Sequence, residues 1–393
     1  MPLKKKTSAM ELQDLNFDQD KLDRLCNRLQ PLLTKHLSDK ELEDSSPQSP
    51  PPPPPNRHHA RQRPNARFFR EYLNGQWCDQ PPVPTKPFTD QTIIVTGANT
   101  GMGLEAARHF VRLDAAKVIV AVRSLAKGQE AVDDITASIK RPGVAEAWEL
   151  DLAGYASVEA FARRANALPR LDVVVANAGV FMYHFERAEG NESTVTVNVV
   201  SHMLLALLAL PKLRETAVAT GKPSTFTFTG SFTHWGTPFE ERKEADILAA
   251  LNDEGKAKMG EERYMVSKMI QLLTARQFAE ELNKSSKQGK VITSVINPGF
   301  VKTQIMRHSS AMFQLYVKAL AAVLSQPPEV GGRMLVLAAE GDETMHGQYL
   351  CDGKIAQPSE WVISEESKPV QEQLWRELTA KLEDIHPGIM GVL

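Results

Sequence analysis

The segment ERYMVSK, residues 262–268, places a tyrosine and a lysine four residues apart, Tyr264 and Lys268. On a helix, side chains with this spacing lie on the same face. A phenol ordinarily loses its proton at about pH 10, and a neighbouring cation lowers that pKa. The pair could therefore act as a general acid or base toward an alcohol or ketone oxygen. Alone, the spacing is more typical of a surface tyrosine packed on a lysine stem, so other residues must decide.

A glycine-rich turn, TGANTGMG at residues 96–103, separates an apolar run at 92–97 from a helical pattern. Glycines at a strand-to-helix junction permit a tight turn and let backbone N–H groups approach a pyrophosphate. The helix N-terminus adds the positive end of its dipole. The turn therefore predicts a dinucleotide site. The residues expected to contact the cofactor here are Gly97, Asn99, Thr100, Gly101, Met102 and Gly103.

Arg123 ends the second expected strand, in VIVAVRS at residues 118–124. Proteins that bind NAD often carry an acidic residue near this place for the ribose, whereas an arginine suits a 2′-phosphate. With Lys127 nearby, we expect NADP(H) in preference to NAD(H), although a solvated arginine after a strand would look the same. Asp151, at the end of the third expected strand, is placed to meet the adenine.

From about residue 87, short apolar runs alternate with helical patterns up to the run KVITSVINPG at 290–299. Strands that are almost wholly apolar indicate a parallel sheet buried on both faces. We therefore expect an α/β fold, a single doubly wound parallel-sheet Rossmann domain at residues 66–393, with ligands at the carboxyl ends of its strands.

Residues 1–65 are expected to form a separate N-terminal extension. The segment at 45–65 is rich in proline, which is typical of an extended, solvated linker. Upstream, leucines near helical spacing at 22–33 indicate either an amphipathic helix that docks on a surface or a marginal helix in a disordered extension.

The bulk composition excludes several classes of protein. A net charge of −2 over 393 residues provides no electrostatic argument for binding nucleic acid. The three cysteines, Cys26, Cys78 and Cys351, are too few and too dispersed for a disulfide framework or a cysteine metal site, and fit a reducing compartment. No secretory signal is evident, and the longest apolar stretch, 203–211, is too short to span a bilayer. We expect a cytoplasmic protein with no resident metal.

Taken together, these motifs resemble the short-chain dehydrogenase/reductase family over roughly residues 87–393. The turn at 96–103 resembles its TGxxxGxG motif, and YMVSK its YxxxK motif. The lead-in from residue 67 also resembles fungal members similar to retinol dehydrogenases. Further matches are NAG at 177–179 with Ala176 replacing the first asparagine of NNAG, VNVV at 197–200, TGS at 229–231 with Gly230 replacing the first serine of a pair, and NPGFVKT at 297–303.

The resemblance implies roles for individual residues. Tyr264 would donate a proton to the substrate oxygen, Lys268 would lower the pKa of Tyr264 and hold the ribose, and Ser231 would orient the substrate. Asn198 would hold a water that links Lys268 to solvent. The remaining cofactor contacts implied are Asn177, Val301 and Thr303. The long interval between Ser231 and Tyr264 would shape the substrate mouth.

The implied activity is NADP(H)-dependent interconversion of a ketone or aldehyde and an alcohol on a bulky apolar small molecule, plausibly in fungal secondary metabolism. In this family the segment at 307–324 forms a lid, and its apolar residues either face such a substrate or only pack on the sheet. The segments around 201–213 and Tyr264 would form a homo-oligomer interface, which the segment at 361–382 could alter. The alternative is an NADP(H)-binding regulatory or scaffold protein without turnover.

Overall fold

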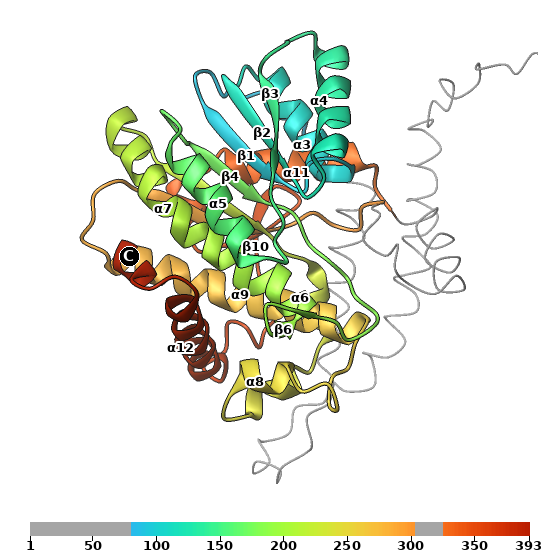
Figure 1. Cartoon of the computed structure of the whole chain (residues 1–393), viewed down its shortest axis with the longest axis vertical. Helices are drawn as coiled ribbons and strands as arrows, with labels where there is room; N and C mark the ends of the chain where they lie inside the picture. Colours follow the sequence, from blue (N-terminus) through green and yellow to red (C-terminus); the bar gives the residue numbers. More distant parts are fainter. Residues whose placement is uncertain (1–79, 303–324) are drawn as a thin grey trace, which may run out of the picture. The chain divides into compact units, whose positions relative to one another are not determined.

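The computed structural model describes residues 80–302 and 325–393. Its central feature is an eight-stranded sheet with the order β10-β9-β8-β7-β4-β1-β2-β3 (Figure 1). Only the β9–β10 pair is antiparallel, so the expected doubly wound, mostly parallel sheet is confirmed. The strands of this sheet are β1 (Thr92–Thr96), β2 (Lys117–Val122), β3 (Ala145–Glu149), β4 (Val173–Ala176), β7 (Ser224–Thr229), β8 (Val291–Asn297), β9 (Tyr349–Cys351) and β10 (Lys354–Ala356).

Helices cover both faces of the sheet, and each face has its own apolar core. In β1, Ile93 and Val95 point into one core and Ile94 into the other, which explains why the strand has no polar face. One face carries α3 (Gly101–Arg112), α4 (Leu125–Ile139) and α11 (Pro328–Ala339), and the other carries α5 (Tyr155–Asn166), α7 (Ser201–Thr220) and α9 (Glu261–Lys284).

Further elements complete the described part of the chain. A two-stranded ribbon, β5 (Arg187–Ala188) and β6 (Asn191–Glu192), leads into α6 (Ser193–Val195) and a π-helical turn, η1 (Thr196–Val200). The remaining elements are η2 (Phe232–Gly236), η3 (Glu240–Lys243), α8 (Ile247–Leu251), η4 (Glu343–Met345), α12 (Ser367–Ile385) and η5 (Ile389–Val392).

The sheet topology determines where a site can form. The chain order of the strands reverses between β1 and β4, which are neighbours in the sheet. In open α/β sheets, ligands bind beyond the carboxyl ends of the strands at such a switch point. The turn after β1, Arg123 after β2, Asn177 after β4 and Ser231 after β7 therefore meet at one edge.

Within the described residues, the helical stretch Ser193–Thr220 is long and apolar enough to cross a membrane. Of the residues in its apolar 18-residue window, 94% are buried, because the stretch packs on the sheet as a core helix. The expected extension at 1–65, the boundary at residue 66 and the whole of the expected lid at 307–324 lie outside the described residues.

Candidate active site

The turn after β1 is locked to the end of β4 through Thr96. The hydroxyl of Thr96 accepts hydrogen bonds from the backbone N–H groups of Asn177 and Ala178, both at 2.9 Å, and its carbonyl accepts one from Asn177 Nδ2 at 2.8 Å. Gly97 has φ +66°, and a Cβ there would lie 2.9 Å from Ala178 Cα. A Cβ on Gly103 would lie 2.5 Å from Asn177 Nδ2. Only glycines allow this close approach.

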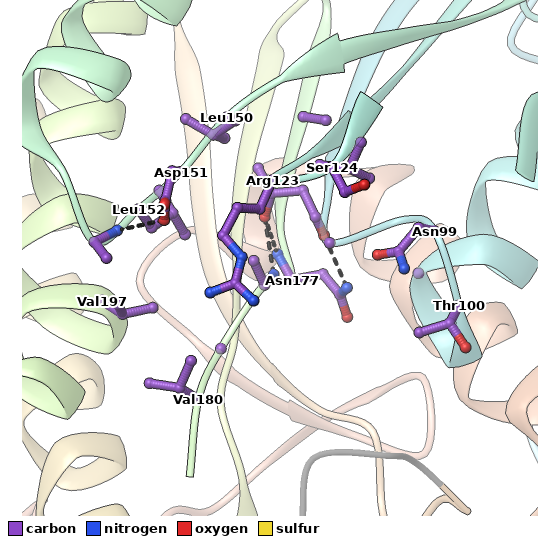
Figure 2. Close-up of a pocket in the computed structure, with 18 of the residues that line it drawn as sticks. Asn99, Thr100, Arg123, Ser124, Leu150, Asp151, Leu152, Asn177, Val180 and Val197 are labelled. Atoms are coloured by element: carbon purple, nitrogen blue, oxygen red, sulfur yellow. Dashed lines mark hydrogen bonds between the residues drawn. The ribbon is translucent and has the colours of Figure 1, made fainter. Parts of the chain in front are cut away.

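A cavity of about 530 Å³ opens at this edge of the sheet (Figure 2). Arg123 and Lys127 are exposed at its border, and the side chain of Arg123 extends into it from the end of β2. The carboxylate of Asp151 accepts a hydrogen bond from the N–H of Ala153 at 3.0 Å. The expected cofactor residues that line the cavity are Gly97, Asn99, Thr100, Gly101, Met102, Gly103, Arg123, Lys127, Asp151 and Asn177.

Ser231 follows β7. Two polar residues near the start of the long interval before Tyr264, Thr233 and His234, hold it in place. Its hydroxyl oxygen accepts hydrogen bonds from Thr233 Oγ1 at 3.0 Å and from Thr233 N at 3.2 Å. Its carbonyl lies 2.7 Å from Nδ1 of buried His234, whose Nε2 accepts the N–H of Ser359 at 3.1 Å. His234 is therefore neutral with its proton on Nδ1. Sequence reasoning missed both residues, and their only signal was their place directly after Ser231.

Tyr264 lies within a stack of aromatic rings, and its phenol is close enough to Ser231 for the serine side chain to affect its pKa. Its ring centroid is 4.9 Å from that of Phe181, which in turn packs against Tyr183 at 5.1 Å. Burial raises the pKa of Tyr264 to about 12, and the Ser231 side chain opposes this rise. In the protein alone, desolvation of the phenolate therefore dominates. The expected lowering of the Tyr264 pKa by Lys268 and the bound nicotinamide stays a prediction.

Lys268 lies on the same face of α9 as Tyr264, with Nζ 5.7 Å from the centroid of the tyrosine ring. Its ammonium donates to the carbonyl of Thr229 at 2.7 Å and to Gln271 Oε1 at 3.1 Å. Burial lowers the pKa of Lys268 to about 7. These two bonds leave one of the three N–H donors of the ammonium for a ligand or for Tyr264.

Asn198 sits in the π-helical turn η1, a rare geometry that is frequent at functional sites. Its Oδ1 accepts from Val180 N at 2.9 Å, and its Nδ2 donates to Val180 O at 3.0 Å and to Ser267 Oγ at 3.1 Å. The side chain therefore fixes the segment after β4 rather than touching Lys268. The backbone carbonyl of Asn198 accepts from Gln271 at 3.1 Å, so Gln271 connects Asn198 with Lys268.

Two further expectations concern the ends of β7 and β8. A Cβ on Gly230 would lie 2.6 Å from Val295 Cγ1, so the neighbouring strand leaves no room for the serine that the resemblance implies there. Val301 is buried and forms a parallel bridge with Gln326 outside the cavity wall. Thr303 lies outside the described residues.

Comparison with known proteins identifies this arrangement. The family model of short chain dehydrogenases matches residues 91–221. The short chain dehydrogenase/reductase dmxR8 of Cryptosporiopsis sp. (strain 8999) is 41% identical over 323 residues, which cover 81% of this chain and 98% of that protein. The chain belongs to the short-chain dehydrogenase/reductase family. Membership makes it an oxidoreductase that acts on small molecules.

Other members of the short-chain dehydrogenase/reductase family show the same relationship. The short-chain dehydrogenase anuD of Penicillium roqueforti (strain FM164) is 39% identical over 323 residues, 81% of this chain and 84% of that protein. A solved 7α-hydroxysteroid dehydrogenase, complexed with NADH and 7-oxo glycochenodeoxycholic acid, superposes with a TM-score of 0.51 at 18% identity. The superposition covers 70% of this chain and 97% of that one, and it confirms the fold.

A nicotinamide dinucleotide, the cofactor of the short-chain dehydrogenase/reductase family, fits the residues of the cavity. The first turn of α3 faces the cavity, and its N-cap residue Thr100 makes no side-chain capping bond, so backbone N–H groups remain for a phosphate. Asn177 Oδ1 is buried and has no hydrogen-bond partner among the described residues. An acceptor left free in this way suits a ligand that carries hydroxyl or amide donors.

Proposed function

We propose that the chain is an NADP(H)-dependent carbonyl reductase or alcohol dehydrogenase that acts on a bulky apolar small molecule. The observation that carries this proposal is the placement of Tyr264 and Lys268 on one face of α9 beside the dinucleotide cavity, with the side chain of Ser231 close enough to act on the Tyr264 phenol. Gly179 lines the cavity, and a Cβ on it would lie 4.0 Å from Lys268 Nζ. The ammonium of Lys268 is therefore close to the dinucleotide cavity.

The residues divide the chemistry of reduction between them. When bound, the cofactor supplies the hydride, and negative charge then develops on the substrate oxygen. Tyr264, whose pKa burial raises to about 12, is protonated at neutral pH and can donate its proton to that oxygen. Ser231 orients the oxygen, and the remaining N–H of Lys268 stabilises the phenolate left on Tyr264. Oxidation of an alcohol uses the same groups in reverse.

A preference for NADP(H) is supported by charge at one end of the cavity. Arg123 and Lys127 are both exposed there, and both can approach a 2′-phosphate. A protein that prefers NAD(H) would instead need a carboxylate at the position of Arg123 to bind the ribose diol.

The bulky apolar substrate is supported by the aromatic residues Phe181 and Tyr183 beside Tyr264. The fungal origin of the relatives supports a role in secondary metabolism, and the lead-in sequence supports a place in the retinol-dehydrogenase-like branch. A cytoplasmic location is supported by the sparse cysteines.

The test follows NADPH oxidation at about 340 nm with ketones, aldehydes and quinones, comparing the wild type with Tyr264→Phe. We expect turnover by the wild type and a loss of at least about 100-fold in the variant, since general acid catalysis contributes that much. Tight NADPH binding without turnover by the wild type would favour the regulatory or scaffold alternative. Equal turnover by both proteins would refute the role of Tyr264.

A further inference from the structure

A chain of buried polar groups leads away from Lys268 into the core. Lys268 Nζ donates to Gln271 Oε1 at 3.1 Å, and Gln271 Nε2 lies 2.9 Å from His202 Nδ1 and 3.1 Å from the carbonyl of Asn198. Lys268 is 4% exposed, Gln271 2% and His202 0%. Neither Gln271 nor His202 belongs to the motifs recognised in the sequence.

The hydrogens in this chain can be assigned from chemistry. An ammonium only donates, so it must meet the oxygen of the Gln271 amide. The amide nitrogen then has two hydrogens, one for the carbonyl of Asn198 and one for His202 Nδ1. His202 Nδ1 also lies 3.2 Å from the carbonyl of Asn198, but the shorter contact with Gln271 Nε2, at 2.9 Å, needs an acceptor at Nδ1. His202 therefore accepts at Nδ1 and carries its proton on Nε2, which has no partner among the described residues. The amide is thus held in a single orientation.

Buried polar residues such as Gln271 and His202 would be an unfavourable choice if they served only to fill the core. The surrounding core of α7, α9 and β7 is apolar, and a buried polar group destabilises the fold unless it is bonded. Leucines at positions 202 and 271 could fill the same space without an unpartnered N–H. This series of hydrogen bonds ends on the ammonium of Lys268. That end point explains why polar residues stand at positions 202 and 271.

We propose that Gln271 is a positioning residue for Lys268, held in place by His202 and the carbonyl of Asn198. This inference rests on the proposed function of Lys268 beside Tyr264. Gln271 and Thr229 direct two N–H groups of the ammonium away from the cavity, which aims the third. Because an ammonium donates a stronger hydrogen bond than a neutral amine, the oxygen of Gln271 also favours the charged form of Lys268.

The electrostatic surroundings of Lys268 make this second effect measurable. The titratable groups that face it are Tyr264 on the same helix and His202 on α7, whose pKa burial and Lys268 together lower to about 3. From β7 it meets the carbonyl of Thr229, and from η1 it meets Asn198 through Gln271. No carboxylate contacts the ammonium among the described residues.

The test compares pH profiles of kcat for NADPH-dependent reduction by Gln271→Leu, Gln271→Met and Gln271→Glu. Leucine and methionine remove the acceptor, so the ammonium is lost at lower pH and activity should fall about one pH unit earlier on the alkaline side. Glutamate places a carboxylate beside the ammonium, so the alkaline limb should move upward by about one unit or more.

Gln277→Leu is the matched control. Gln277 is a buried glutamine on the same helix, 5% exposed and bonded to Gln371 at 2.9 Å and Glu281 at 2.8 Å, but it contacts no proposed catalytic group. It should lower the melting temperature without moving the alkaline limb. Melting temperatures of all variants separate loss of folding from loss of positioning.

Opposite shifts for the apolar and acidic variants, with none for the control, would support the inference. If the Gln271 variants that fold turn over substrate with the same pH profile of kcat as the wild type, the inference is overturned. Absence of turnover by the wild type would instead count against the proposed function. The pH dependence of NADPH binding, followed by its fluorescence, would then replace kcat, and equal profiles for wild type, Gln271→Met and Gln271→Glu would overturn the inference.

Discussion

At the scale of single residues, the clearest feature is the set of hydrogen bonds that fixes Ser231. Thr233 bonds its hydroxyl oxygen, and His234 bonds its carbonyl while accepting the N–H of Ser359. A serine fixed at two points presents its hydroxyl in a single direction, which is what an orienting group requires. The bond from Ser359 requires an unprotonated Nε2, so the anchoring of the His234 ring to Ser359 exists only while His234 is neutral.

His234 should therefore make stability depend on pH. Burial lowers its pKa to about 4, below about 6.5 in the unfolded chain. The unfolded chain then binds the proton first, so stability is complete above about pH 6.5 and is lost as the pH falls toward about 4. His234→Asn keeps a donor toward Ser231 but cannot titrate. Its melting temperature should fall less than that of the wild type between about pH 7 and 5.

The slope removed by His234→Asn should be at most about 1.4 kcal/mol of unfolding free energy per pH unit. His202, also buried and neutral, retains its own share of the dependence. His184→Asn, the same substitution at an exposed histidine, provides the control for the change of side chain itself. Parallel curves for His234→Asn and the wild type would contradict the assigned neutral state.

Arg123 carries the prediction on cofactor choice. Arg123→Asp replaces a cation that can meet a 2′-phosphate with a carboxylate that suits a ribose diol. NADPH binding should weaken by at least about tenfold, with a much smaller change for NADH, because a charge-assisted bond is lost and repulsion is gained. The dissociation constants can be measured by fluorescence. Lys140→Asp, the same charge change at an exposed site away from the cavity, is the control. Equal losses for both nucleotides would refute the 2′-phosphate assignment.

At the scale of elements, the π-helical turn with Asn198 is tied to the helix with Tyr264 by a buried ion pair. Arg263 is 1% exposed and Glu192 0%, and Arg263 Nε lies 3.6 Å from Glu192 Oε2. Glu192 also accepts the N–H groups of Thr194 at 2.7 Å and Val195 at 3.3 Å at the start of α6. The carboxylate therefore serves the guanidinium and the helix end together.

Removing the two partners should have unequal effects. Glu192→Ala leaves the buried guanidinium of Arg263 with Glu241, 3.8 Å away, as its remaining ion-pair partner among the described residues, and should lower the free energy of unfolding by about 3–5 kcal/mol. Arg263→Met removes the charge that needs a partner and leaves Glu192 its backbone bonds, so the loss should be smaller. Urea unfolding measures both. A larger loss for Arg263→Met would contradict this account of the pair.

At the scale of the whole molecule, the C-terminal segment is part of the catalytic fold. Leu374, Leu378 and Leu382 of α12 are buried, and Trp375 packs against Phe278 of α9 at 6.4 Å. The following turn η5 packs on α7. α7 and α9 carry the faces expected to form a subunit interface, so part of that surface is covered by the chain itself. A homo-oligomer stays a prediction.

Leu378 measures what this helix contributes. It is 1% exposed, and Leu378→Ala should lower the free energy of unfolding by about 2–5 kcal/mol, through lost burial and the cavity left behind. The exposed Arg376 on the same helix is the control, with an expected change within about 0.5 kcal/mol for Arg376→Ala. Similar small effects of both substitutions, measured by urea unfolding, would show that α12 packs only loosely.

The proline-rich extension has a different expected behaviour. If residues 1–65 are a linker, their deletion should leave kcat, KM and the elution volume on gel filtration unchanged, because such a segment buries no apolar surface of the catalytic domain. A change in elution volume would assign the extension to assembly. A fall in activity at unchanged size would place it near the site.

Several features of this protein followed from its sequence alone, because they depend on local pattern. Apolar runs alternating with helical periodicity predicted the doubly wound sheet, and the turn at 96–103 predicted the cavity that its glycines now line. The spacing of Tyr264 and Lys268 was enough to place both on one face of a helix. Arg123 could be placed at the cavity because it directly follows a strand.

Other features were decided by the tertiary structure, because they arise from segments distant in sequence. The raised pKa of Tyr264 reflects desolvation by surrounding elements, which no local motif reports. Gly230 is required by Val295 on the neighbouring strand. His202 and Gln271 are 69 positions apart and meet only when α7 packs on α9, so their link to Lys268 became visible only in the folded chain.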